Sequence, residues 1–187
     1  MNEVLQAIYD RRSVRAFKPQ QVKEDDLTLI LEAGRQAPSA KNGQPWHFTV
    51  VQRKSLSDRI GAAAKEAYAK DPEFAKKSPW MLKPEFNLLY GAPTVVWVSG
   101  EASNPNAQGD CGIAVENMAI AAHSLGLNSC IIISALPAFA TKNGPTFIKD
   151  LGIPEGFKPM YAFALGYTAA PLPAPAPRKE DCVNYVR

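Results

Sequence analysis

A basic cluster near the N-terminus contains the residues of this sequence best suited to bind an anion. Three arginines and one hydroxyl lie within five positions, as Arg11, Arg12, Ser13 and Arg15. An arginine side chain stays charged and offers planar, paired donors that match a phosphate group, and a serine hydroxyl adds a further donor. Charged clusters are also common at the solvated ends of helices, so the segment by itself is equally consistent with a charged turn.

A second segment, residues 37–48, combines small residues with amide and hydroxyl side chains in the order APSAKNGQPWHF. The small residues permit close approach to a flat ligand, and Ser39, Asn42 and Gln44 offer hydrogen bonds of the kind that a heteroaromatic ring needs. The alternative is a capped loop with Trp46 packed in the core.

Few other side chains suggest protein-borne chemistry. His47 is expected to be a strand residue, because no carboxylate or nucleophile lies near it in sequence. Cys111 and Cys130 lie in apolar surroundings and are expected to be core thiols. The three cysteines of the chain lack metal-ligand spacing, so no metal site is predicted. No catalytic nucleophile is predicted either, because Cys111 and Cys130 are expected to lie in the core.

Helix and strand patterns position both polar segments at the ends of elements. Apolar spacing predicts a helix from Asn2, its N-cap, to the basic cluster. A second helix is expected to start in the acidic residues 24–26 and to end before Pro38, and residues 47–52 form a strand. The basic cluster therefore follows a helix, and the polar segment connects a helix to a strand.

The remaining pattern indicates an α+β fold, with a small mixed sheet wrapped by helices around one long central helix. No regular βαβ rhythm and no Gly-x-Gly-x-x-Gly after the first strand are present, which disfavours a Rossmann domain. Further helices are expected from a capping box at Ser55–Asp58, at 110–125 as the strongly apolar central helix, and from Pro145 to about Gly152. Strands are expected at 93–99, 129–134 and 160–166. Residues 71–90 are expected to be irregular with one helical segment, and residues 169–177 to form an extended proline-rich tail.

Composition is that of one globular domain over residues 1–187, in which 168–187 form an extended C-terminal arm. Of the 187 residues, 46% are hydrophobic and 21% charged. The net charge of +3 without a basic run disfavours an extended nucleic-acid or membrane footprint. Three cysteines suit a reducing compartment, so the cytoplasm is expected, and no apolar run approaches a membrane span.

The two polar segments together resemble the FMN-dependent nitroreductases, through R-R-S-V-R-x-F and A-P-S-A-K-N-G-Q-P-W-H-F. The likeness continues through residues 110–118, 125–127 and 163–167, with Arg178 beyond, and spans nearly the whole chain. It implies the nitroreductase fold and an FMN cofactor reduced by NADH or NADPH.

The resemblance also implies a site in three parts. Arg11, Ser13 and Arg15 would bind the phosphate and ribityl chain, with Arg12 adjacent and Arg178 reaching the phosphate. The second part, which would lie along the flavin from the opposite subunit of a homodimer, is the loop with Pro38, Ser39, Ala40, Asn42 and Gln44. The third part is the strand end Ile132-Ile133-Ser134, whose backbone N–H groups would meet the flavin ring near N5.

The strand end departs from the family pattern. Many relatives have a proline, an acidic residue and a glycine where this chain has Ile131, Ile133 and Ser134. A backbone contact survives these changes, whereas an acidic side chain beside the flavin is lost. Asn87 is the nearest candidate for the asparagine that binds the ribityl chain in some relatives.

The implied reaction transfers hydride from NADH or NADPH to FMN and then, by a ping-pong mechanism, to a small conjugated acceptor such as a nitroaromatic or a quinone. Two alternatives stay open. One is a flavin-binding or redox-sensing module without catalysis, and the other is a specialised flavin reaction such as ene reduction, dehalogenation or flavin fragmentation. Bulk in residues 71–90 would discriminate between the enzyme and the non-catalytic module. The large side chains of this segment would either form an aromatic wall for stacked substrates or close the site; they are Trp80, Met81, Phe86 and Tyr90.

Overall fold

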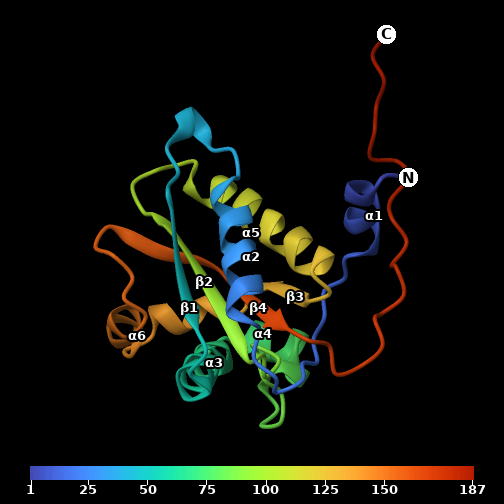
Figure 1. The fold of residues 1–187 in the computed structure, drawn as a ribbon. Coiled ribbons are helices and arrows are strands. Elements are labelled where there is room, and N and C mark those ends of the chain that lie inside the picture. The colour runs from blue at the N-terminus through green and yellow to red at the C-terminus, as the bar shows by residue number, and fades with distance from the viewer.

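A four-stranded sheet lies between two layers of helices in the computed structural model, which describes residues 1–187 (Figure 1). The strand order is β1-β2-β4-β3, and every pairing between these strands is antiparallel. The strands are β1 (Trp46–Val51), β2 (Thr94–Glu101), β3 (Asn128–Ile132) and β4 (Phe157–Gly166).

The α+β class is confirmed, but the expectation of a mixed sheet is wrong. The only parallel pairing is an isolated bridge between Ser13 and Ser129, outside the four-stranded ladder. Strand β2 is buried on both faces, a pattern typical of parallel strands. Here helices cover both faces of an antiparallel sheet, so the same apolar pattern arises without parallel pairing.

Each face of the sheet has its own core. On one face, Val96 and Val98 of β2 pack in a cluster with residues of α2 (Glu24–Arg35) and α5 (Ala107–Ser124). On the other face, Val95 and Trp97 pack with residues of α3 (Lys54–Ala69), the 3-10 turn Leu136–Ala140 and α6 (Gly144–Asp150). The alternation follows from the two-residue period of a strand.

Helix α5 is the central helix, because it lies between the sheet and α2. Asn117 of α5 donates a hydrogen bond to the Ala33 carbonyl of α2 at 3.1 Å. Gly34 lets the two helices approach closely, since a Cβ at this position would lie 2.8 Å from Met118 Cγ. The helix begins at Ala107, three residues earlier than predicted, because its first turn contains polar residues that hide the apolar period.

The N-termini of α1 (Glu3–Asp10) and α3 show whether the two predicted capping side chains are in place. The side chain of Asn2 accepts a hydrogen bond from Leu5 N at 2.9 Å, which confirms it as the N-cap of α1. The capping box at Ser55 is wrong: α3 begins at Lys54, and Ser55 lies inside its first turn. Burial of Leu56 and Ile60 sets the position of this helix without a side-chain cap.

Residues 71–90 contain α4 (Pro72–Lys77) and a 3-10 turn at Pro79–Leu82, with turns elsewhere. After β4 the chain forms an exposed tail without helix or strand, which passes α1 in Figure 1. None of the helices combines the length and apolar character that crossing a membrane requires.

Candidate functional site

The basic turn, residues 11–15, follows α1 and is fixed by backbone hydrogen bonds to the sheet. Val14 N donates to Ser129 O at 2.9 Å, at the start of β3. Just beyond the turn, Lys18 N donates to Tyr167 O at 2.8 Å, next to the end of β4. Val14 is buried, so the backbone of this segment is part of the fold and not a free loop.

The three arginines of the basic turn have different environments. Arg11 Nε lies 3.0 Å from Glu116 Oε1 of α5, close enough for an ion pair but not aligned for a hydrogen bond. Arg12 donates to Tyr9 O at 2.6 Å and to Arg11 O at 2.8 Å, so its guanidinium caps the end of α1. Arg15 is exposed and lies over the Tyr90 ring.

A groove of about 260 Å³ separates the basic turn from the first residues of the tail. Its walls are residues 13–16 on one side and Thr168, Ala170, Pro171 and Pro173 on the other. Arg178 does not line it and donates only to its neighbour Ala176 O, at 2.9 Å. Within one chain, Arg178 is therefore not brought to the other arginines.

The polar loop, residues 37–44, has an unusual backbone. Lys41, Asn42 and Gln44 have φ angles of 53°, 53° and 46°, in the left-handed region that non-glycine residues rarely adopt. Ser39 Oγ accepts from Gln44 N at 2.9 Å, and Asn42 Oδ1 accepts from Gln44 Nε2 at 3.2 Å. Such backbone strain is concentrated at functional sites, which supports a binding role for the loop.

Asp110 anchors the polar loop to α5. Its buried carboxylate accepts from Ala40 N at 3.2 Å. The sequence pattern indicates only that Asp110 lies at a helix start. One of the two acidic residues in a mainly apolar helix was the available signal, but its partner lies 70 residues away.

The basic turn and the polar loop approach different parts of α5. The loop contacts Asp110, whereas the basic turn contacts Glu116, six residues or about 9 Å further along the helix. No hydrogen bond or ion pair joins the two segments. In Figure 1 the loop between α2 and β1 lies at the upper left, and α1 lies to the right.

The end of β3 exposes backbone donors. The strand ends at Ile132, which is buried, and Ile133 is 62% exposed. Neither Ile133 nor Ser134 donates its N–H group in the backbone hydrogen-bond network. Both groups are therefore available to a ligand that brings acceptor atoms to this edge.

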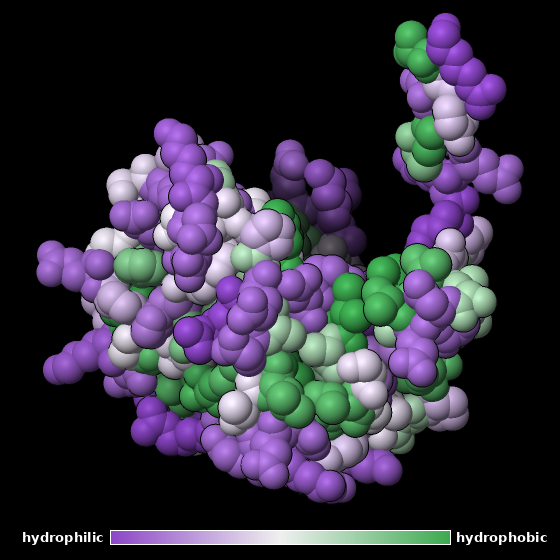
Figure 2. All heavy atoms as spheres, turned by 45° about the horizontal axis from the view of Figure 1, so that its top comes forward, coloured by the Kyte–Doolittle hydropathy of each residue, from purple (hydrophilic) through white to green (hydrophobic).

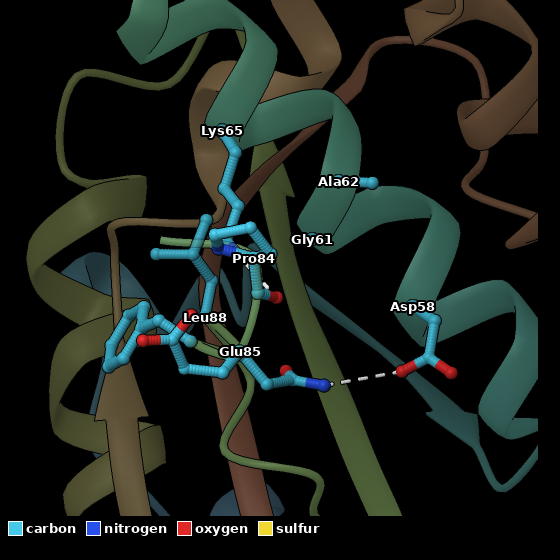
Figure 3. Close-up of a pocket in the computed structure, with 9 residues that line it drawn as sticks. Asp58, Gly61, Ala62, Lys65, Pro84, Glu85 and Leu88 are labelled. Atoms are coloured by element: carbon cyan, nitrogen blue, oxygen red, sulfur yellow. Dashed lines mark hydrogen bonds between the residues drawn. The ribbon is translucent and has the colours of Figure 1, made fainter. Parts of the chain in front are cut away.

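Asn87 contacts α3, in the layer of helices on the opposite face of the sheet from α5. Its amide donates to Asp58 Oδ1 at 3.3 Å and accepts from Leu89 N at 2.8 Å. It lines a pocket of about 270 Å³ between α3 and residues 84–88, in which Figure 3 shows the dashed contact to Asp58. These bonds hold the turn around Asn87 against α3.

Cys111 and Cys130 are buried, unpaired core thiols, as predicted. Burial, with the adjacent Asp110 carboxylate as the second cause, raises the pKa of Cys111 to about 12. Burial also raises the pKa of Cys130, and the positive charges of Arg15 and Arg11 oppose that rise. The positive charges of the basic turn therefore act on a side chain of β3, the Cys130 thiol.

Comparison with known proteins gives consistent matches. The model of the Nitroreductase family matches residues 8–167. A Bacteroides fragilis nitroreductase structure with bound FMN is 36% identical, with a TM-score of 0.90 and full coverage of both chains. A Desulfitobacterium hafniense nitroreductase with bound FMN is 32% identical, with a TM-score of 0.90 and full coverage of both chains.

One curated relative has a name that specifies both the flavin and the nicotinamide donor. The FMN reductase [NAD(P)H] of Bacillus subtilis is 28% identical over 90% of this chain and 67% of its own length. With the family match over 8–167 and the nitroreductase fold, these findings show that the chain belongs to the nitroreductase family.

Proposed function

We propose that this protein binds FMN and uses NADH or NADPH to reduce small conjugated acceptors, such as nitroaromatics and quinones. The observation that carries the proposal is the basic turn, held rigidly beside a groove of about 260 Å³. Relatives of 36% and 32% identity contain FMN over the same fold. Three unpaired cysteines suit a reducing compartment, in line with a cytoplasmic enzyme.

The residues present fit the cofactor. Arg11 and Arg15 supply cationic donors for its phosphate, with the hydroxyl of Ser13 between them. Arg12 supports the turn by capping α1. Arg178 does not approach the turn of its own chain, so it would have to reach the phosphate from the tail of a second copy. The free N–H groups of Ile133 and Ser134, next to Ile132, suit acceptor atoms of the flavin ring.

When bound, FMN supplies the hydride chemistry, since it accepts hydride from a nicotinamide and passes it to an acceptor. The protein binds and orients the cofactor. A ping-pong sequence follows if donor and acceptor occupy the same space over the ring in turn. No side chain of this chain needs to form a covalent bond.

The proposed active form is a homodimer with FMN at the interface. Helix α1 has no buried residue and exposes Val4, Leu5, Ile8 and Tyr9, each by at least 46%. Figure 2 shows hydrophobic residues gathered on the face that includes the base of the tail. An apolar face of this kind is typical of a surface that a second subunit covers.

A second copy would also complete the site. The polar loop and the basic turn of one chain contact α5 about 9 Å apart, with no bond between them. In line with the family resemblance, the loop that lies along each flavin would come from the partner. Pro38, Ser39, Ala40, Asn42 and Gln44 of that loop would approach the ring.

The test of the reaction combines cofactor analysis with rapid kinetics. Protein reconstituted with FMN is expected to retain it, and anaerobic stopped-flow mixing with NADH or NADPH should bleach the flavin absorbance, which an added nitroaromatic or quinone restores. Recovery of FAD, or of no flavin, would remove the proposal. Bound FMN that neither donor bleaches would favour the redox-sensing alternative.

The test of the assembly is sedimentation velocity followed through flavin absorbance, on the full chain and on a chain that ends at Tyr167. We expect a dimer for the full chain, and loss of both dimer and flavin after truncation. A full-length monomer with FMN bound at micromolar concentration would defeat the interface, even if it still reduced nitro compounds.

A further inference from the structure

The polar loop is tied to the rest of the fold at its two ends and at one point between them. At its start it follows α2, and just beyond its end Glu101 N of β2 donates to Pro45 O at 3.0 Å. Over residues 38–44, a single hydrogen bond joins the loop to another element. It runs from Ala40 N to the carboxylate of Asp110 in α5, whose two oxygens lie 3.2 Å and 3.4 Å from the nitrogen. Asp110 is therefore the only hydrogen-bonding tether in the middle of the loop.

The conformation that this tether holds is strained. Lys41, Asn42 and Gln44 have left-handed φ angles, and residues 40–44 are exposed, so burial in the core does not impose these angles. The hydrogen bonds within the loop set its internal shape. They cannot set its position against the rest of the fold, which depends on Asp110.

Asp110 is buried although it carries a charge. It is 7% exposed, beside the fully buried Cys111, and no basic side chain lies within ion-pair distance of it. Burial of a carboxylate without a cationic partner costs free energy. Its one hydrogen-bond donor is Ala40 N, and a charged acceptor forms a bond about twice as strong as a neutral one. The carboxylate therefore contributes to the fold through the polar loop.

Helix α5 presents a second carboxylate to the basic turn. Glu116 lies 3.0 Å from Arg11 Nε, six residues beyond Asp110. The helix is packed in the core between the sheet and α2, so the two acidic side chains keep a fixed separation. In the proposed dimer, the basic turn binds the FMN of its own chain, and the polar loop approaches the FMN of the partner. The two carboxylates of one α5 would then support two different flavin sites.

We propose that Asp110 is a positioning residue for the flavin site of the partner subunit. It holds the polar loop in the strained conformation that approaches the ring of FMN, while the basic turn of the partner binds the phosphate of the same FMN. The inference rests on the proposed function, since FMN and the dimer belong to it. Loss of the bond to Ala40 frees the loop, and flavin affinity falls with the fraction of molecules that keep the binding conformation.

The first test follows the loop itself, on full-length protein without flavin. Lys41 is exposed, so trypsin cleaves after it once the loop opens, and mass spectrometry measures the peptide that ends there. Asp110→Ala should accelerate this cleavage about tenfold or more, because loss of a hydrogen bond to a charged group shifts the open population by that factor. Asp110→Asn keeps a neutral acceptor, so its rate should lie between those of wild type and Asp110→Ala.

The matched control is Asp150→Ala. Asp150 pairs with Arg59 at 3.3 Å, on the opposite face of the sheet from α5, so its loss should leave cleavage after Lys41 unchanged. Circular dichroism verifies that each variant folds, and Asp110→Asn decides the test if the alanine variant folds poorly.

The second test measures the dissociation constants of FMN and riboflavin by flavin fluorescence. The loop approaches the ring, which both ligands share, so Asp110→Ala should weaken both by the same factor, about tenfold or more. Arg11→Ala should weaken FMN about tenfold or more and leave riboflavin unchanged, because only FMN has the phosphate.

The third test determines which subunit Asp110 serves. Chains with Asp110→Ala and chains with Arg11→Ala, carrying different affinity tags, are co-expressed, and dimers with one chain of each are purified through both tags. If Asp110 serves the partner, one site of this hybrid has an intact basic turn and an intact loop, and the other site has neither. The hybrid should therefore bind one FMN per dimer with wild-type affinity, whereas each parent dimer binds FMN weakly at both sites.

Three outcomes would overturn the inference: unchanged cleavage after Lys41 in both Asp110 variants, an effect of Asp110→Ala on FMN but not on riboflavin, or a hybrid with two weak sites. The last outcome would mean that Asp110 acts on the flavin of its own chain. A wild-type protein that binds neither flavin would instead refute the proposed function. The cleavage test on flavin-free protein would still decide whether Asp110 holds the loop.

Discussion

Two helical glycines provide a sharp test of the packing, because the same change at each should have opposite effects. Replacing glycine by alanine inside a helix stabilises the folded state by about 0.5–1 kcal/mol. At Gly61 of α3 an added Cβ would meet nothing within 4 Å, since this position lines the pocket drawn in Figure 3. Gly61→Ala should therefore raise the free energy of unfolding by about 0.5–1 kcal/mol.

At Gly34 the added methyl would enter the contact between α2 and α5. Its Cβ would lie 2.8 Å from Met118 Cγ, 3.1 Å from Met118 Sδ and 3.3 Å from Phe48 Cζ. Overpacking of this kind costs about 1–3 kcal/mol, which exceeds or cancels the helix gain. We expect Gly34→Ala to lower the free energy of unfolding by about 0 to 2.5 kcal/mol.

The assay is urea unfolding followed by circular dichroism, at one protein and one FMN concentration for all variants, because binding and association shift apparent stability. A double-mutant cycle with Met118→Ala provides the control: Gly34→Ala should be less harmful when the Met118 side chain is absent. If Gly34→Ala raised the free energy of unfolding as much as Gly61→Ala does, the reasoning would be refuted. That result would show that the Met118 side chain moves aside without a cost in stability.

The other predictions concern charge and thiols. Arg15→Ala should weaken FMN binding about tenfold or more, from loss of about 1.5–3 kcal/mol, while circular dichroism stays unchanged; an unaltered dissociation constant would show a merely solvated turn. The pKa of Cys111 rises from 9.0 to about 12 on folding, so the native state retains a proton that the unfolded chain loses. Stability should be unaffected by this group below about pH 9 and fall above it, by about 2 kcal/mol at pH 10.5. Unfolding curves of Cys111→Ala should show a shallower alkaline decline, and an identical slope would contradict this assignment. A colorimetric thiol reagent at neutral pH should modify only Cys182, the exposed cysteine, in the native protein; rapid modification of a second thiol would contradict the burial of Cys111 and Cys130.

Features that depend on neighbours along the chain were predictable from the sequence. The Asn2 cap, the acidic start of α2 and the apolar period of α5 depend on residues within a few positions of one another. The basic turn and the polar loop were recognisable because each concentrates its side chains in a short segment.

Tertiary structure decided the direction of the strands and the partners of the site residues. An apolar strand pattern reports burial and not direction, so it did not distinguish an antiparallel sheet covered by helices from a mixed one. Asp110 meets the polar loop, Glu116 meets Arg11, and Tyr90 meets Arg15. These contacts join residues 70 or more positions apart, and only the packing of α5 and residues 80–90 against the rest of the fold brings them together.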